Sequence, residues 1–221
     1  KLEGIRQDTK GGSSGVYKLP MGQIEQSAGF DKLLQDIRSL AEDASGREME
    51  CYDVPDCFTL FQNAAAVREL FIKAVEAMGQ AATPAVKVVI PKEPLKKPCG
   101  VMEKATVAAM AAGSDSVRVD RVCDVVRATL VCREVQQMHA IIEALSRGDN
   151  GVRVVRVKDR LSTPAPGGWH DVIVNFYLRG DQDRHVCEVQ LVFSRLLEAR
   201  QYGEAGLGLH EDFTVLRASS E

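Results

Sequence analysis

Four runs rich in β-branched and other apolar residues lie in the second half of the chain, and one helical segment interrupts them. The runs cover residues 122–132, 152–158, 170–178 and 185–193, and a shorter run at 86–90 precedes them. The helical segment spans 134–147, and Gly148 is placed to cap it. This order predicts an α+β fold with a mixed, largely antiparallel sheet of about five strands flanked by helices.

The first half of the chain is expected to be mostly helical. Residues 1–26, rich in Gly, Ser and charge, predict a flexible lead-in, and residues 27–221 one domain that begins with a helical segment over about 27–82. Apolar spacing and alanine content predict helices over 30–46, 63–81 and 100–112. We interpret the helical segment as a cover for the sheet. The alternative is a docking surface for a protein partner.

Composition narrows the class of protein. A 45% hydrophobic content supports a real core, and 28 Lys+Arg against 31 Asp+Glu give a formal charge of -3. The chain therefore lacks the basic excess of proteins that grip duplex nucleic acid. It has no apolar run long enough for a membrane span and no Cys-x-x-Cys pair, so we expect a soluble, intracellular protein without a zinc cluster.

Two acidic residues stand inside apolar, strand-like runs: Asp124 in the first run and Glu188 in the last. Glu188 shares a strand face with Gln190. A carboxylate in such a strand is costly unless a cation, a metal ion or hydrogen-bond donors compensate it. The two acids could share Mg²⁺, which prefers oxygen ligands and bridges nucleotide phosphates to one or two carboxylates. Alternatively, each forms a salt bridge, for example Asp124 with Arg127.

A basic stretch and a Pro/Gly loop lie between these acids. The stretch is Arg156-Val157-Lys158-Asp159-Arg160, and the loop at 164–168 leads to Trp169, the only tryptophan of the chain. A strand-end lysine can neutralise phosphate, and an aromatic ring beside a glycine turn can stack on a nucleobase. Packing against the sheet edge is the alternative for Trp169.

The order of these motifs resembles the synthetase domain of the RelA/SpoT family. There, a strand with Asp-x-x-x-Arg and a helix are followed by Arg-x-Lys-Asp, a Pro-Lys-x-Asn-Gly-Tyr loop, a Ser-Leu-His strand and Val-Glu-Ile-Gln. This chain is similar at Asp124, at Arg156-x-Lys158-Asp159, over 164–169 and at Cys187-Glu188-Val189-Gln190. The resemblance covers roughly the last hundred residues, with the motifs in the same order.

The resemblance implies a nucleotidyltransferase-like fold and transfer of pyrophosphate from ATP to a 3'-hydroxyl of GDP, GTP or another acceptor. Asp124 and Glu188 would be catalytic and hold Mg²⁺, and Glu188 would also orient or deprotonate the hydroxyl. Trp169 replaces the tyrosine that stacks on guanine. The remaining nucleotide-binding positions that the resemblance implies are Lys158, Gln190, Lys96, Lys104, Arg127 and Arg156.

Several family positions carry different residues in this chain. Ala165 and Gly167 replace the lysine and asparagine of the loop, Ile173 the strand histidine, Val192 an arginine, and Pro94 the arginine that stacks on adenine. Each lost charge-assisted contact is worth about 1.5–3 kcal/mol. Candidate substitutes are Lys92, Lys96, Lys97, Arg127, Arg156 and Arg160. Two hypotheses remain open: a divergent enzyme, and a binding or scaffold module that has lost the reaction.

Overall fold

The computed structural model of the chain describes residues 14–45, 54–93 and 95–207. Its helices and strands are, in chain order, α1 (Ser14–Glu25), α2 (Phe30–Ser45), α3 (Cys57–Gln80), β1 (Lys87–Val89), α4 (Pro98–Ala111), β2 (Arg127–Cys132), α5 (Val135–Arg147), β3 (Val152–Asp159), β4 (Val172–Leu178), β5 (Cys187–Phe193) and α6 (Ser194–Leu207). Among these residues, no helix is both long and apolar enough to cross a membrane.

The five strands form one mixed sheet in the order β1-β2-β5-β4-β3. β2 and β5 pair in parallel, whereas β1–β2, β5–β4 and β4–β3 pair antiparallel. The predicted α+β class with a largely antiparallel sheet of about five strands is therefore confirmed. The parallel pair matters for the site, because it sets β2 beside the last strand although α5, β3 and β4 separate the two in sequence.

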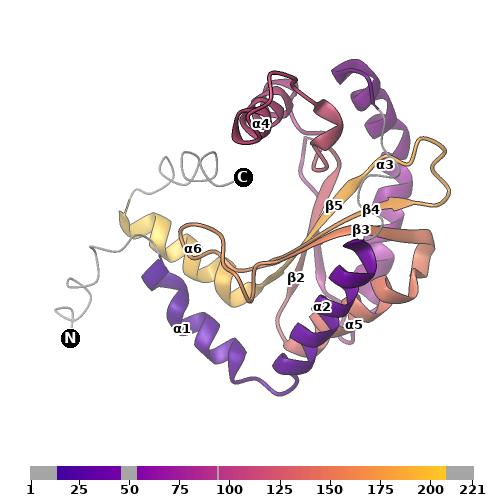
Figure 1. Cartoon of the computed structure of the whole chain (residues 1–221). Helices are drawn as coiled ribbons and strands as arrows, with labels where there is room; N and C mark the ends of the chain where they lie inside the picture. Colours follow the sequence, from indigo (N-terminus) through magenta and orange to yellow (C-terminus); the bar gives the residue numbers. More distant parts are fainter. Residues whose placement is uncertain (1–13, 46–53, 94, 208–221) are drawn as a thin grey trace.

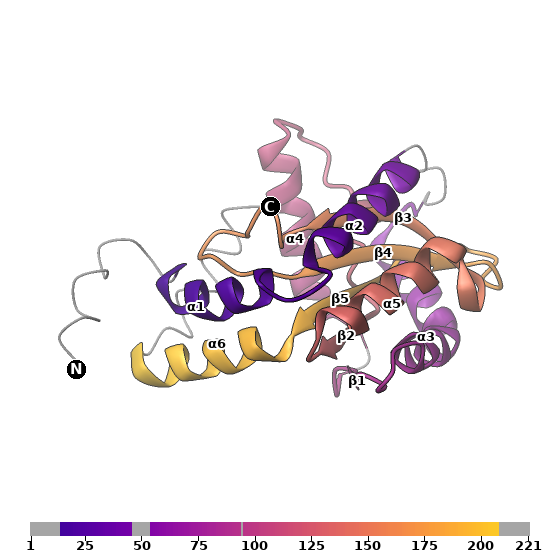
Figure 2. The same cartoon turned by 90° about the horizontal axis from the view of Figure 1, so that it is seen from below.

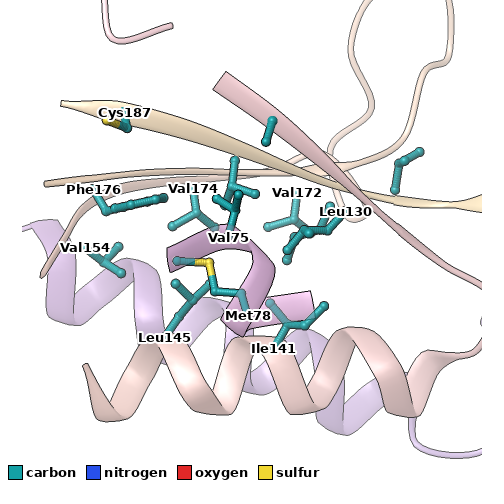
Figure 3. Close-up of a cluster of buried hydrophobic side chains, with 14 of the residues drawn as sticks. Val75, Met78, Leu130, Ile141, Leu145, Val154, Val172, Val174, Phe176 and Cys187 are labelled. Atoms are coloured by element: carbon teal, nitrogen blue, oxygen red, sulfur yellow. The ribbon is translucent and has the colours of Figure 1, made fainter. Parts of the chain in front are cut away.

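Helices α2, α3 and α5 cover one face of the sheet, and α4 stands over the other (Figures 1 and 2). On the covered face, Val172, Val174 and Phe176 of β4 project toward Met78 of α3 and Ile141 of α5 (Figure 3). Each of these five side chains is at most 1% exposed. Ile173 of β4 and Glu188 and Gln190 of β5 instead face the side of α4.

Capping interactions fix the ends of two covering helices. The Asp56 carboxylate accepts a hydrogen bond from the Thr59 N–H at 2.8 Å, so α3 begins earlier than the apolar stripe predicted. The Gln137 side chain accepts from the Glu134 N–H at 3.1 Å at the start of α5. Gly148 ends α5 at φ 71°, as predicted, because this left-handed conformation suits glycine. Gly46, at which the helix predicted over 30–46 was expected to end, lies outside the described residues.

Helix α1 corrects the prediction of a flexible lead-in over residues 1–26 for the part that the structure describes, since Ser14–Glu25 are helical. Tyr17, Met21 and Ile24 lie on one side of α1 and are 2–4% exposed. This helix runs alongside α6 in both views (Figures 1 and 2). The apolar residues of α1 are spread among Gly, Ser, Lys and Pro and gave only a weak local signal, and the helix beside α1 comes much later in the sequence. Residues 1–13 lie outside the described part.

The strand predicted over 122–132 is shorter in the structure. β2 begins at Arg127, after a 3₁₀ turn at Val119–Arg121 and an irregular segment that contains Asp124. Val122, Val125 and Val126 are 1% exposed. The first part of the apolar run is therefore buried without being a strand. Asp124 is a loop residue just before the start of β2.

Candidate functional site

A cleft of about 430 Å³ lies between α4 and the sheet face that the other helices leave open. Residues of α4 and of strands β2, β3, β4 and β5 line it, together with loop residues that include Lys96, Asp124 and Arg160. The cleft concentrates charge: five basic side chains (Lys96, Lys104, Arg127, Lys158 and Arg160) and three acidic ones (Glu103, Asp124 and Glu188). A chain with a formal charge of -3 thus has a locally cationic cleft, which favours anionic ligands.

Asp124 is the most heavily paired acid of the cleft. Its Oδ2 lies 2.7 Å from Lys96 Nζ, 3.5 Å from Lys104 Nζ and 3.8 Å from Arg127 Nη1. Burial opposes its ionisation, yet Lys104, Lys96 and Arg127 together hold the pKa of this carboxyl below its usual value. Its other oxygen, Oδ1, is buried and accepts no hydrogen bond from the described residues. The site thus contains an ionised carboxylate with one unused oxygen.

Glu188 lies on the cleft face of β5, opposite Arg127 of β2 and Asn175 of β4 in the sheet register. Its backbone N–H donates to the Val126 carbonyl at 2.9 Å, which ties it to the segment that carries Asp124. Burial raises the pKa of the Glu188 carboxyl, and the negative charge of Asp124 raises it further. The pKa of Asp124 is therefore lowered and that of Glu188 raised, although both carboxyl groups lie in the same cleft.

Asn175 connects Glu188 to a residue outside the cleft lining. Its Nδ2 donates to Glu188 Oε2 at 3.3 Å, and its Oδ1 accepts from Arg156 Nε at 2.9 Å. Asn175 is fully buried. Arg156 does not line the cleft, so it acts on Glu188 through Asn175 rather than at the nucleotide position expected for it. Sequence reasoning missed Asn175, although a lone amide on the same strand face as Ile173 was the available signal.

Trp169 also lies away from the cleft lining. Its side chain is 9% exposed and packs edge-on against Tyr17 of α1, with ring centroids 5.5 Å apart. The Arg200 guanidinium of α6 lies over the ring, 5.4 Å from its centroid. This position does not agree with a nucleobase platform and matches the packing alternative. The reason is α1, which the sequence did not predict and which takes the space beside the ring.

No protein-family model and no curated protein matches the sequence. Similar solved structures include small alarmone synthetase 1 from Bacillus subtilis bound to its product pppGpp (12% identity, TM-score 0.45, 72% of this chain and 85% of that chain). The fold is similar to that of small alarmone synthetases. A GTP pyrophosphokinase family protein from Streptococcus pneumoniae is also similar (10% identity, TM-score 0.44, 73% of this chain and 94% of that chain).

A third similar structure is the Type VI effector Tas1 in complex with its immunity protein (20% identity, TM-score 0.43). The match covers 61% of this chain and 59% of the Tas1 chain, so it spans less than two thirds of that protein.

The structure brings most of the residues implied by the RelA/SpoT resemblance together. Asp124, Glu188, Gln190, Lys96, Lys104, Arg127 and Lys158 all line the cleft, whereas Arg156 and Trp169 do not. Glu103, which the sequence did not single out, also lines it. No signal in the sequence pointed to Glu103, because a charged residue on a helix usually faces solvent.

Two carboxylates are the candidate ligands for a metal ion. Among residues 14–45, 54–93 and 95–207, no three His, Cys, Asp or Glu side chains are grouped to hold one. Mg²⁺ needs fewer protein ligands, because waters and substrate phosphates complete its octahedral shell. The unused Oδ1 of Asp124 and the Glu188 carboxyl in the same cleft fit such a site.

Proposed function

We propose that the chain is a divergent RelA/SpoT-like pyrophosphotransferase domain, which transfers pyrophosphate from ATP to a 3'-hydroxyl of a guanine nucleotide or another acceptor. The supporting observation is the cleft, in which two carboxyl groups with oppositely shifted pKa values lie among five cationic side chains. Environments that separate the pKa values of two acids assign them different roles. Asp124 stays anionic, and Glu188 is the stronger base.

In the proposed reaction, the acceptor oxygen attacks the β-phosphorus of ATP. The bond from this phosphorus to the oxygen that bridges it to the α-phosphorus breaks, AMP leaves with the bonding electrons, and the hydroxyl proton passes to Glu188. A raised pKa suits this role, because a general base works best when its pKa approaches the working pH. Asn175 and Arg156 orient the carboxylate for the transfer.

The cationic side chains bind and align the phosphates. Lys158 and Arg160 line the cleft from the β3 side, and Lys96 and Lys104 line it from the loop before α4 and from α4 itself. Asp124 and Glu188 would hold Mg²⁺, which when bound neutralises charge on the phosphates during in-line transfer. Positioning and charge neutralisation supply most of the catalysis in reactions of this type.

A binding module without turnover is the second candidate. Lys96 Nζ lies 2.7 Å from Asp124 Oδ2, so a protein cation already neutralises the carboxylate proposed to hold the metal. Ile173 lines the cleft where the family has a histidine, which removes one polar contact. Such a module would bind nucleotides in the same cleft and release no AMP.

Turnover is the direct test. The chain would be incubated with ATP labelled in its γ-phosphate, Mg²⁺ and a panel of hydroxyl acceptors, and labelled product and AMP would be measured. We expect Glu188→Gln to lower the rate about 100-fold or more, since general-base catalysis contributes about 10²–10⁴. Glu76→Gln, on the exposed side of α3, is the matched control and should leave the rate unchanged. Absence of product with every acceptor would exclude the enzyme and leave the binding module.

A further inference from the structure

A buried carboxylate outside the cleft lining accepts hydrogen bonds from three side chains. Asp171, directly before β4, is 0% exposed. Its oxygens accept two hydrogen bonds from Arg160, Nε to Oδ1 at 2.6 Å and Nη2 to Oδ2 at 2.7 Å. Oδ2 also accepts from Trp169 Nε1 at 2.7 Å and from Gln190 Nε2. The burial of this charge is thus compensated by one cation and two neutral donors.

Two of these three donors line the cleft. The bidentate pair with Asp171 uses Nε and Nη2 of Arg160 and fixes the plane of its guanidinium group. The Nε2 of Gln190 donates a hydrogen bond to Asp171, and its Oε1 accepts one from the Thr129 hydroxyl at 3.5 Å. Asp171 therefore sets the direction in which a cation and an amide of the cleft are presented, without lining the cleft itself.

The third donor connects Asp171 to the helices at the two ends of the described chain. Trp169 packs against Tyr17 of α1 and under Arg200 of α6. These two helices lie side by side at one end of the molecule (Figures 1 and 2). The indole N–H thus donates to the buried carboxylate, and the ring contacts Tyr17 of α1 and Arg200 of α6.

We propose that Asp171 is a positioning residue that orients Arg160 and Gln190 for a polyphosphate ligand, and that the α1–α6 pair holds Asp171 in place through Trp169. The role rests on the proposed function only in the choice of ligand. Loss of the Asp171 charge frees the Arg160 guanidinium to rotate. Loss of the indole N–H loosens Asp171 while leaving an aromatic ring between the helices.

The sole tryptophan allows a test that needs no ligand. Trp169 emission would be compared between the wild type, Arg160→Gln and Arg147→Gln. Arg147 is a matched control, because it also donates two hydrogen bonds to an aspartate, Asp149, but on the surface. We expect Arg160→Gln to change the emission through Asp171 and Arg147→Gln to leave it unchanged. Unchanged emission in folded Arg160→Gln would overturn the link.

Binding tests the positioning role. Calorimetry with inorganic triphosphate and Mg²⁺ should give affinities about tenfold weaker for Asp171→Asn and for Trp169→Phe, in line with the loss of one charge-assisted contact. The double variant Asp171→Asn/Arg160→Gln should be no weaker than the weaker single variant, because both act on one contact. A purely structural role would lower the melting temperature and leave the affinity of the folded protein unchanged.

The outcomes separate this inference from the proposed function. Wild-type affinity in Asp171→Asn, or additive losses in the double variant, would overturn the positioning role and leave the proposed function intact. Failure of the wild type to bind either triphosphate or ATP would overturn the proposed function and, with it, the role of Asp171 toward a polyphosphate. In that case the emission comparison still decides whether Asp171 connects Arg160 to Trp169.

Discussion

Lys96 Nζ lies 2.7 Å from Asp124 Oδ2, and the two side chains are only 19% and 11% exposed. The Lys96 backbone N–H also donates to the Val125 carbonyl at 3.0 Å, so main chain and side chain fasten the same loop to the segment that carries Asp124. Lys96 and Asp124, which are 28 residues apart in sequence, thus meet in the cleft. The pair compensates the buried carboxylate and places a cation where phosphates are expected.

Removal of the Lys96 ammonium should destabilise the protein. We expect Lys96→Met to lower the free energy of unfolding by about 1–3 kcal/mol, below the full cost of an uncompensated buried charge because Lys104 remains near Asp124. Lys97→Met removes a neighbouring exposed pair with Glu93 and should cost less than about 1 kcal/mol. Urea unfolding measures both, and equal losses would contradict the account of the buried pair.

The raised pKa of Glu188 gives stability a specific pH dependence. Between the usual carboxyl pKa of 4.5 and the higher folded-state pKa, the folded protein binds more protons than the unfolded chain, so this group lowers stability as pH rises. We therefore expect Glu188→Gln to be more stable relative to the wild type at pH 7 than at pH 4. Urea unfolding across this range measures the difference. A difference that does not change with pH would contradict the raised pKa.

Gly79 marks a close contact between α3 and β1. A Cβ atom at this position would lie 2.7 Å from Val88 Cγ2, so Gly79→Ala should cost about 1–3 kcal/mol by overpacking. Gly22 of α1 has nothing within 4 Å of the corresponding position, and Gly22→Ala should stabilise the helix by up to about 1 kcal/mol. Thermal unfolding distinguishes the two substitutions. A stabilising Gly79→Ala would show that this contact is looser than described.

Helix α1 should contribute to stability despite its unpromising sequence. Tyr17 is 2% exposed, whereas Leu19 of the same helix is 73% exposed. We expect Tyr17→Ala to lower the free energy of unfolding by about 2–4 kcal/mol, as for other large buried side chains, and Leu19→Ala to have little effect. Chemical unfolding with circular dichroism detection measures both. Similar small effects would contradict the burial of Tyr17 against Trp169.

Local patterns were sufficient to predict much of the sheet and of its covering helices. Gly148 ended a helix where a left-handed residue was needed, and the apolar runs located strands β3, β4 and β5. Glu188 was found because a carboxyl group inside an apolar strand needs a partner. These signals lie within a few residues of one another, so tertiary structure had little opportunity to override them.

The remaining features depend on contacts between distant segments. Trp169 is buried because α1 and α6 meet beside it, and neither helix is near it in sequence. Asp124 lies in a loop and not in the predicted strand. The sequence could not show this, because a buried loop and a buried strand produce the same apolar run. Asp171 and Asn175 bond to side chains of β5, Gln190 and Glu188 respectively, and no spacing in the sequence identifies such partners.

We propose that Asp124 and Glu188 serve one cleft, which binds a nucleotide together with Mg²⁺. The decisive measurement is calorimetric titration of ATP into the wild type, Asp124→Asn and the control Glu76→Gln, each with and without Mg²⁺. We expect Mg²⁺-dependent binding to the wild type and the control, and binding about tenfold or more weaker in Asp124→Asn. No binding to the wild type, or equal Mg²⁺-dependent binding in all three, would contradict it.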